Sequence, residues 1–193
     1  MARKKYEFRP DKVKTDFLGK LYLTPQQRKK LLRWLLFAVL LVTVSVLQDV
    51  VLCRISYLGG GTDLVPCLIF MIAALEGAEE GSIFALIASV VYFFSGSAPG
   101  PYMIPLVTGI AIFMAILRQA CLPRGFFSIL LCAALGMAAY EMLLFAIGMF
   151  LGNIPLDRME AMLRTALYTL CGFPIAYPLA RLIGKIGGET WKE

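Results

Sequence analysis

The 193-residue sequence contains no histidine, and its five cysteines are scattered without a C-x-x-C pair. Zinc and haem sites are built mainly from histidine and closely spaced cysteine, so this composition argues against both kinds of site. We therefore expect no metal and no other bound cofactor. Charged residues are also scarce, at 17% of the chain.

Signatures of membrane enzymes are missing as well. The stretch "EEGSIF" begins like the E-E-x-x-x-R of intramembrane prenyl-protein proteases, but Phe84 stands where the arginine is needed. "GGGTD" is one residue out of step with the G-x-G-D of aspartyl intramembrane proteases, and neither G-x-S-x-G nor a phosphate-binding P-loop occurs. We therefore expect a protein that is not an enzyme.

Apolar residues are abundant instead. They make up 59% of the chain, with a mean hydropathy of +0.75, against about 45–50% in soluble proteins. They occur in blocks of roughly membrane-spanning length, which predicts helices and not the short alternating strands of a membrane barrel. The sequence thus predicts an all-α polytopic membrane protein with about six transmembrane helices.

The first helix is expected to start at Thr24 and Pro25, which suit an N-cap and the first helical position, and to cross the membrane from Trp34 to Val51. The next helices are expected at Leu64–Leu75, Ser82–Phe94, Tyr102–Leu117, Phe126–Leu151 and Met162–Ile183, the last one bent at Pro174 and Pro178.

The segments Leu64–Leu75 and Ser82–Phe94 are shorter than the ~20 residues of a standard span, so they could form either a re-entrant hairpin or two crossings. A hairpin would place Glu76, Glu79 and Glu80 at membrane depth. Each charge would then cost at least ~2.5 kcal/mol. We therefore expect two short crossings.

Charge is distributed unevenly. Residues 1–33 hold eleven Lys/Arg and three Asp/Glu, a net +8, whereas the remainder holds eight and ten, a net −2. Six crossings place sixteen of the nineteen Lys/Arg on the side of the termini, with only Arg54, Arg158 and Arg164 opposite. The positive-inside rule then predicts cytoplasmic termini, and the basic tail is interpreted as facing anionic lipid, not nucleic acid.

The chain divides accordingly into three parts: a basic cytoplasmic segment (1–33), a helical transmembrane domain (34–185) and a short cytoplasmic tail (186–193).

Glu141 lies within the fifth predicted span. Its predicted helix face is made mostly of small residues and comprises, at helical spacing, Ala134, Ala138, Phe145, Gly148 and Gly152. Small residues allow close packing, so Glu141 is expected inside the bundle, neutral and donating a hydrogen bond unless it meets a cation. It serves either packing between helices or a ligand or ion site.

Further polar candidates gather near the outer ends of the predicted helices: Gln48, Asp49, Asp63, Tyr92 and Ser95. A ligand pocket and a polar network between helices would look alike in sequence. Asp49 and Asp63 also fit residues that simply reach interfacial water, and Asp63 suits an N-cap.

The order of these features resembles MreD, a membrane subunit of the bacterial cell-elongation machinery. The resemblance covers residues 35–185 and rests on "VSVLQDVVL", "TDLVPCLIF", "GSIFALIASVVYFFSG" and "SGSAPGPYM". Two positions depart from that family's pattern: Thr62-Asp63 stands in place of Pro-Asp, and Tyr92 in place of an Asp that ends the third span.

The resemblance implies a multi-pass scaffold in the bacterial cytoplasmic membrane. It would bind MreC and thereby link cytoplasmic MreB to the peptidoglycan synthases. The family is similar in fold to the substrate-binding subunits of energy-coupling-factor vitamin transporters, which supply the alternative function. A ligand subunit should enclose a pocket with convergent polar groups, whereas a scaffold should fill that space. The short "GGG" and "SGSAPGP" loops offer little material for a lid and favour the scaffold.

Overall fold

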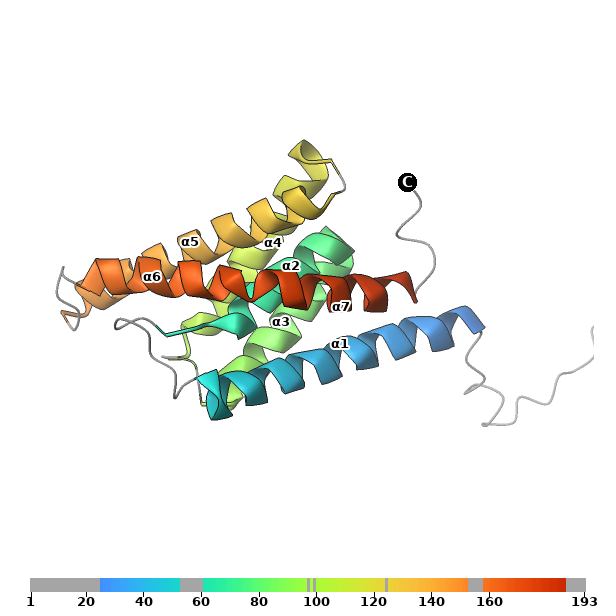
Figure 1. Cartoon of the computed structure of the whole chain (residues 1–193), viewed down its shortest axis with the longest axis horizontal. Coiled ribbons are helices and arrows are strands. Elements are labelled where there is room, and N and C mark those ends of the chain that lie inside the picture. Colours follow the sequence, from blue (N-terminus) through green and yellow to red (C-terminus); the bar gives the residue numbers. More distant parts are fainter. Residues whose placement is uncertain are drawn as a thin grey trace, which may run out of the picture.

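The computed structural model describes residues 25–52, 61–96, 98, 100–123, 125–152 and 158–186. These residues form seven α-helices and no strand, which confirms the predicted all-α class (Figure 1). The helices are α1 (Pro25–Val50), α2 (Leu64–Glu76), α3 (Ala78–Phe94), α4 (Met103–Cys121), α5 (Phe126–Phe150), α6 (Arg158–Cys171) and α7 (Phe173–Lys185).

Several of these helices are long and apolar enough to cross a membrane. In the described part of the chain α1, α4 and α5 qualify singly, and α6 with α7 qualifies as one further span bent by 49°. The two segments that were expected to form short crossings are helical, as α2, with 13 residues, and α3, with 17. Three or four helices are therefore span candidates on length and composition, and six crossings stay a prediction.

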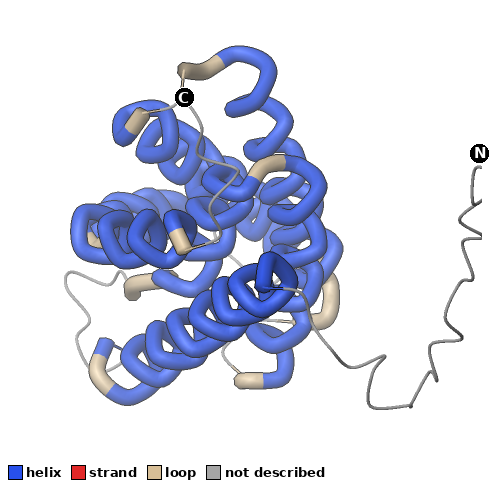
Figure 2. The backbone as a smooth tube through the Cα atoms, turned by 90° about the vertical axis from the view of Figure 1, so that its right-hand side faces the viewer, coloured by secondary structure: helices blue, strands red, loops and turns tan. Residues whose placement is uncertain are grey.

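The short helix α2 forms the centre of the bundle. It contacts every other helix, and its residues from Val65 to Leu75 are all buried. A helix that is apolar on all sides has no polar face to turn toward water, so it is stable only when other helices surround it. Figure 1 shows α2 in the middle of the bundle, and Figure 2 shows the same bundle of helices from the side.

The corner between α2 and α3 consists of one residue, Gly77, whose φ of +94° is a conformation that favours glycine. The stretch "EGAEEG" was expected to separate two helices, but α3 begins at Ala78, so most of that stretch is helical. Gly81 then allows α3 to press against α2, because a Cβ there would lie 2.7 Å from the Ala73 carbonyl oxygen.

The expected last helix is broken into α6 and α7. The break falls at Gly172, two residues before Pro174. Pro178 lies inside α7 and does not end that helix. Pro174 has no N–H for the carbonyl of residue 170, and its ring crowds that carbonyl. The Gly172 N–H instead donates to the Thr169 oxygen in a tighter turn (3.0 Å).

One face of α1 packs on the bundle, through Arg33, Phe37, Leu41 and Gln48. The other faces expose large apolar side chains such as Val39 and Val46. Such exposure suits a helix in contact with lipid, since lipid tails are as apolar as these side chains.

The buried face of α5 differs from the predicted one. Glu141 and Gly148 are buried, but Ala138 and Gly152 are exposed, so the face centres on Cys132, Gly136 and Tyr140. Large residues share this face with small ones, because Phe70 of α2 packs against Gly136 and against the Tyr140 ring.

Candidate functional site

The polar residues with the most specific contacts gather at the two ends of α2. A buried helix end is costly, because the first N–H groups and the last carbonyls of a helix have no partners within it. We name the groups at its start the Asp63 cluster (Gln48, Asp63, Thr165 and Thr169). Those at its end form the Glu76 cluster (Lys30, Arg33, Glu76, Glu80 and Arg118).

The Asp63 cluster joins three helices by hydrogen bonds. The Gln48 Nε2 of α1 donates to Asp63 Oδ1 (3.2 Å), and the Val65 N–H at the start of α2 donates to Gln48 Oε1 (3.0 Å). The Asp63 N–H donates to the Thr169 hydroxyl of α6 (2.9 Å). Asp63 occupies the N-cap position but makes no capping bond with its own side chain, so Gln48 satisfies this helix end from a neighbouring helix.

Asp63 carries a perturbed carboxyl group. Burial raises its pKa to about 6, the negative charge of Asp49 raises it as well, and the hydrogen bond from Gln48 opposes this change. Since Asp63 precedes α2, it lies outside the spanning helices. The cluster therefore contains a group that titrates in the physiological range.

Two tyrosines and Glu141 lie beside this cluster. The Tyr92 hydroxyl faces Gln48 and Tyr140, and both tyrosines interact with Asp63. Both rings are fully buried and Glu141 is 4% exposed. Within the described residues, the Glu141 Oε1 has no hydrogen-bond partner. The hydrogen bond expected for Glu141 is thus not seen for that atom.

The structure brings the predicted site residues together only in part. Gln48 and Asp63 bond directly, Tyr92 lies next to them, and Asp49 acts on Asp63 through its charge while remaining exposed. Ser95 is exposed at the end of α3, where its hydroxyl donates to the Tyr92 carbonyl (2.8 Å). Ser95 therefore serves the helix end and not the cluster.

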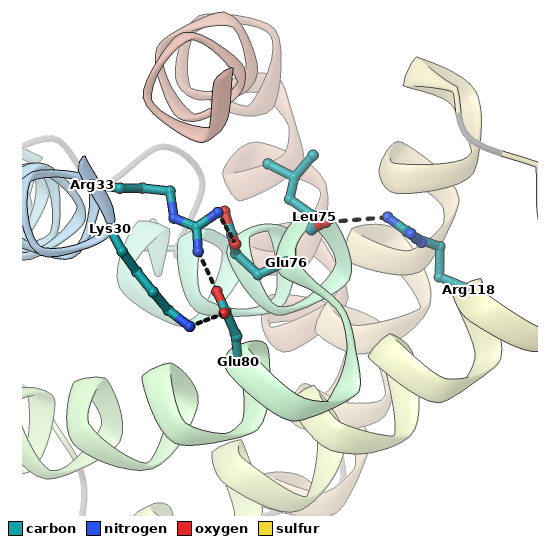
Figure 3. Close-up of polar contacts among 6 residues, drawn as sticks. All are labelled: Lys30, Arg33, Leu75, Glu76, Glu80 and Arg118. Carbon is teal, nitrogen blue, oxygen red and sulfur yellow. Dashed lines mark hydrogen bonds and ion pairs between the residues drawn. The ribbon is translucent and has the colours of Figure 1, made fainter. Parts of the chain in front are cut away.

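The Glu76 cluster contains three ion pairs, of which one, Arg33–Glu76, is buried on both sides. Arg33 of α1 pairs with Glu76 at the end of α2 (Nη1 to Oε2, 3.0 Å) and with Glu80 of α3, and Lys30 also pairs with Glu80 (Figure 3). The side chains of Arg33 and Glu76 are each 4% exposed. Glu80 is therefore neutralised by two cations, Lys30 and Arg33.

Arg118 of α4 satisfies the last carbonyls of α2. Its Nη1 donates to the Ala74 oxygen (2.7 Å). It also donates to the Leu75 oxygen (3.3 Å; Figure 3). A cation at the C-terminus of a helix also interacts favourably with the helix dipole. With Gln48 at the start and Arg118 at the end, α2 can be buried along its whole length.

Several residues of these clusters were not predicted, among them Arg33, Glu76, Arg118 and Thr169, and neither was Tyr140 beside them. Arg33 and Arg118 were treated as markers of topology at helix ends. A signal was present, because Arg118 continues the buried face of Val107, Ala111 and Met114 at helical spacing. A basic residue that continues the core-facing stripe of a helix should therefore be interpreted as a buried partner of a polar group on another helix.

Among the cavities formed by the described residues, the groove of useful size does not include the residues of either cluster in its lining. A groove of about 230 Å³ between α1, α2 and α7 is lined almost wholly by apolar side chains. The hollow beside Glu141 measures about 10 Å³, and almost no free space lies beside the Glu76 cluster. No group of three or more His, Cys, Asp or Glu in the described segments is placed to hold a metal ion.

Comparisons with protein-family models, curated proteins and solved structures find no match to this chain.

Proposed function

We propose that the chain is a non-catalytic membrane scaffold of the bacterial cell-elongation machinery, of the MreD kind. In this proposal it binds MreC and so links cytoplasmic MreB to the peptidoglycan synthases. The sequence resemblance over residues 35–185 supplies the identity of the machinery. The structure bears on the choice between a scaffold and a ligand-binding subunit.

One observation favours the scaffold. The polar groups at the start of α2 bond to backbone ends and to each other: Gln48 holds both Asp63 and the Val65 N–H, and Thr169 holds the Asp63 N–H. None of these side chains lines the 230 Å³ groove, which is apolar. Ligand pockets typically measure ≈300–1,000 Å³ and present polar groups that fix orientation, so this arrangement suits packing better than substrate binding.

The proposal includes six crossings, with α2 and α3 as short ones and both termini in the cytoplasm. The arrangement of contacts supports an antiparallel α1 and α2, because Arg33 meets the end of α2 while Gln48 meets its start. The Glu76 cluster would then lie at the cytoplasmic side, where the positive-inside rule favours Lys30 and Arg33. The Asp63 cluster would face the outside.

Affinity capture tests the proposal. The tagged full-length chain is purified from its native membranes in mild detergent, and co-purifying proteins are identified by mass spectrometry against an unrelated tagged protein with a similar number of spans. We expect MreC and the elongation synthases. Recovery of a transporter ATPase with its coupling membrane subunit would contradict the scaffold and support the vitamin-transporter alternative.

A further inference from the structure

The groove between α1, α2 and α7 is apolar throughout. Its walls include Leu40 and Val44 of α1, Leu64 and Cys67 of α2, and Ala176 of α7. Thr43 also lines it, but its hydroxyl donates to the Val39 carbonyl within α1 (2.8 Å). An occupant would therefore meet no polar group that lacks a partner, so only a hydrocarbon matches this lining.

The groove is a fixed feature and not loose packing. The Arg33–Glu76 ion pair and the Gln48–Asp63 hydrogen bond hold α1 to opposite ends of α2. These two contacts lie about 22 Å apart along α1, at 1.5 Å per residue, and the groove residues lie between them. The third wall, α7, also packs tightly on α2 at its start. Gly172 lies so close to Leu64 that a Cβ there would be 2.6 Å from Leu64 Cδ2. The helices cannot close the groove without breaking these contacts.

The groove opens toward the surroundings of the bundle. At its rim Leu47 is 46% exposed, Ile175 73% and Leu179 47%. Both α1 and the α6–α7 pair are span candidates, and the groove is lined by the second half of α1, from Leu40 to Leu47. In a bilayer these residues face lipid tails, because the hydrocarbon core is about 30 Å thick and spans most of α1.

Size decides which hydrocarbon enters. An α-helix is about 10 Å across with its side chains, and α1 and α7, two walls of the groove, already contact each other. A partner helix is therefore too large to enter, whereas a single extended chain is narrow enough. We propose that this groove binds one acyl chain of a membrane phospholipid. Because the lining carries no charge, the lipid is selected by its chain and not by its head group.

Native mass spectrometry of the full-length chain tests this inference, which does not depend on the proposed scaffold role. The protein is washed in detergent to remove loosely bound lipid, and the phospholipid retained per chain is counted. Two variants fill the groove from opposite walls, Thr43→Phe and Ala176→Phe. The matched control is Ala138→Phe, which adds the same ring at an exposed position of α5 outside the groove.

We expect about one phospholipid per chain in the original protein and in the control, and none in either filled variant. Adding phosphatidylglycerol or phosphatidylethanolamine back to delipidated protein should raise the melting temperature equally, and only where the groove is open. Equal retention in filled and control variants would overturn the proposal. So would retention that follows the head group alone. If one filled variant fails to fold, the other and the lipid add-back still decide.

Discussion

Arg33 and Arg118 are buried cations at the same end of α2, and they act on different groups. Arg33 meets the Glu76 carboxylate, whereas Arg118 meets backbone carbonyls. Removing one member of a buried pair leaves a charge that has lost its water and its partner, at a typical cost of about 3–5 kcal/mol. Neither arginine is therefore comparable with the exposed Arg181 and Lys185 at the end of α7.

Asp63 should give the protein a distinct pH dependence. Its folded pKa of about 6 exceeds the ordinary 3.8, so the folded state binds a proton more tightly than the unfolded state. Its contribution to stability should therefore rise as the pH falls from about 6 toward 4, and be lost above 6. Melting curves in detergent between pH 4.5 and 7.5 measure this change.

Asp63→Asn is the matched variant for this pH dependence, because the amide keeps the shape and can still accept from Gln48. We expect it to flatten the profile over that interval. An unchanged profile would assign the pH dependence to other groups.

Glu141 is a second residue whose substitution is informative. Its Oε1 is buried without a hydrogen-bond partner in the described structure, and an unpaired buried polar group costs on the order of 1–3 kcal/mol. We expect Glu141→Leu to keep or raise the melting temperature of the isolated chain. Glu141→Gln, which preserves the polar group, should change it little.

Capture of partner proteins with the same two variants gives the complementary readout. If the carboxyl serves an interface, the Leu variant should lose partner while the Gln variant retains it. A Leu variant that melts well below both the original protein and the Gln variant would instead mean that Glu141 is needed for the packing of α5.

At the scale of elements, the close contact of α2 and α3 depends on Gly81. A Cβ there would lie 2.7–2.8 Å from the Ala73 backbone, and backbone cannot move aside as a flexible side chain does. We expect Gly81→Ala to cost about 1–3 kcal/mol, the usual effect of overpacking, as measured by melting or denaturant titration in detergent.

Gly109→Ala is the matched control on α4. Nothing lies within 4 Å of a Cβ at that exposed position, so the variant should gain up to about 1 kcal/mol from the better helix propensity of alanine. Equal destabilisation by both substitutions would contradict the account of the α2–α3 contact.

The sequence predicted the existence of the long helices better than their ends or their surroundings. Apolar length located α1, α4 and α5, because a membrane span is a strong compositional signal. The same signal cannot distinguish a helix that faces lipid from one that faces protein, so the central burial of α2 was missed. The break at Gly172 depends on local hydrogen bonding before Pro174, which composition does not record.

Among site residues, the bond between Gln48 and Asp63 was within reach of sequence reasoning, because both were placed near one end of the bundle. Thr169 was not, since it lies 106 residues from Asp63 and bonds its backbone. Threonine is common in apolar helices, and the sequence does not indicate which group its hydroxyl bonds. Contacts between a side chain and a distant helix end need the fold itself.

For the whole molecule, the proposed orientation is directly testable. With the native cysteines replaced, a cysteine at Thr15 in the basic tail should resist a membrane-impermeant thiol reagent in intact cells. A cysteine at Leu151, which is 62% exposed at the end of α5, should react, because five crossings place it outside. Reaction at both positions, or the reverse pattern, would overturn the proposed orientation.

The dependence of α2 on other helices also bears on biogenesis. During synthesis α2 emerges before α4 and α6. Its last carbonyls nevertheless require Arg118 of α4, and the Asp63 N–H at its start requires the Thr169 hydroxyl of α6. Until those segments are inserted, this short apolar helix has both ends incompletely satisfied in the membrane. A nascent chain that ends before α6 should therefore be a preferred substrate for insertion chaperones and quality-control proteases, and release from them should coincide with insertion of the final helices.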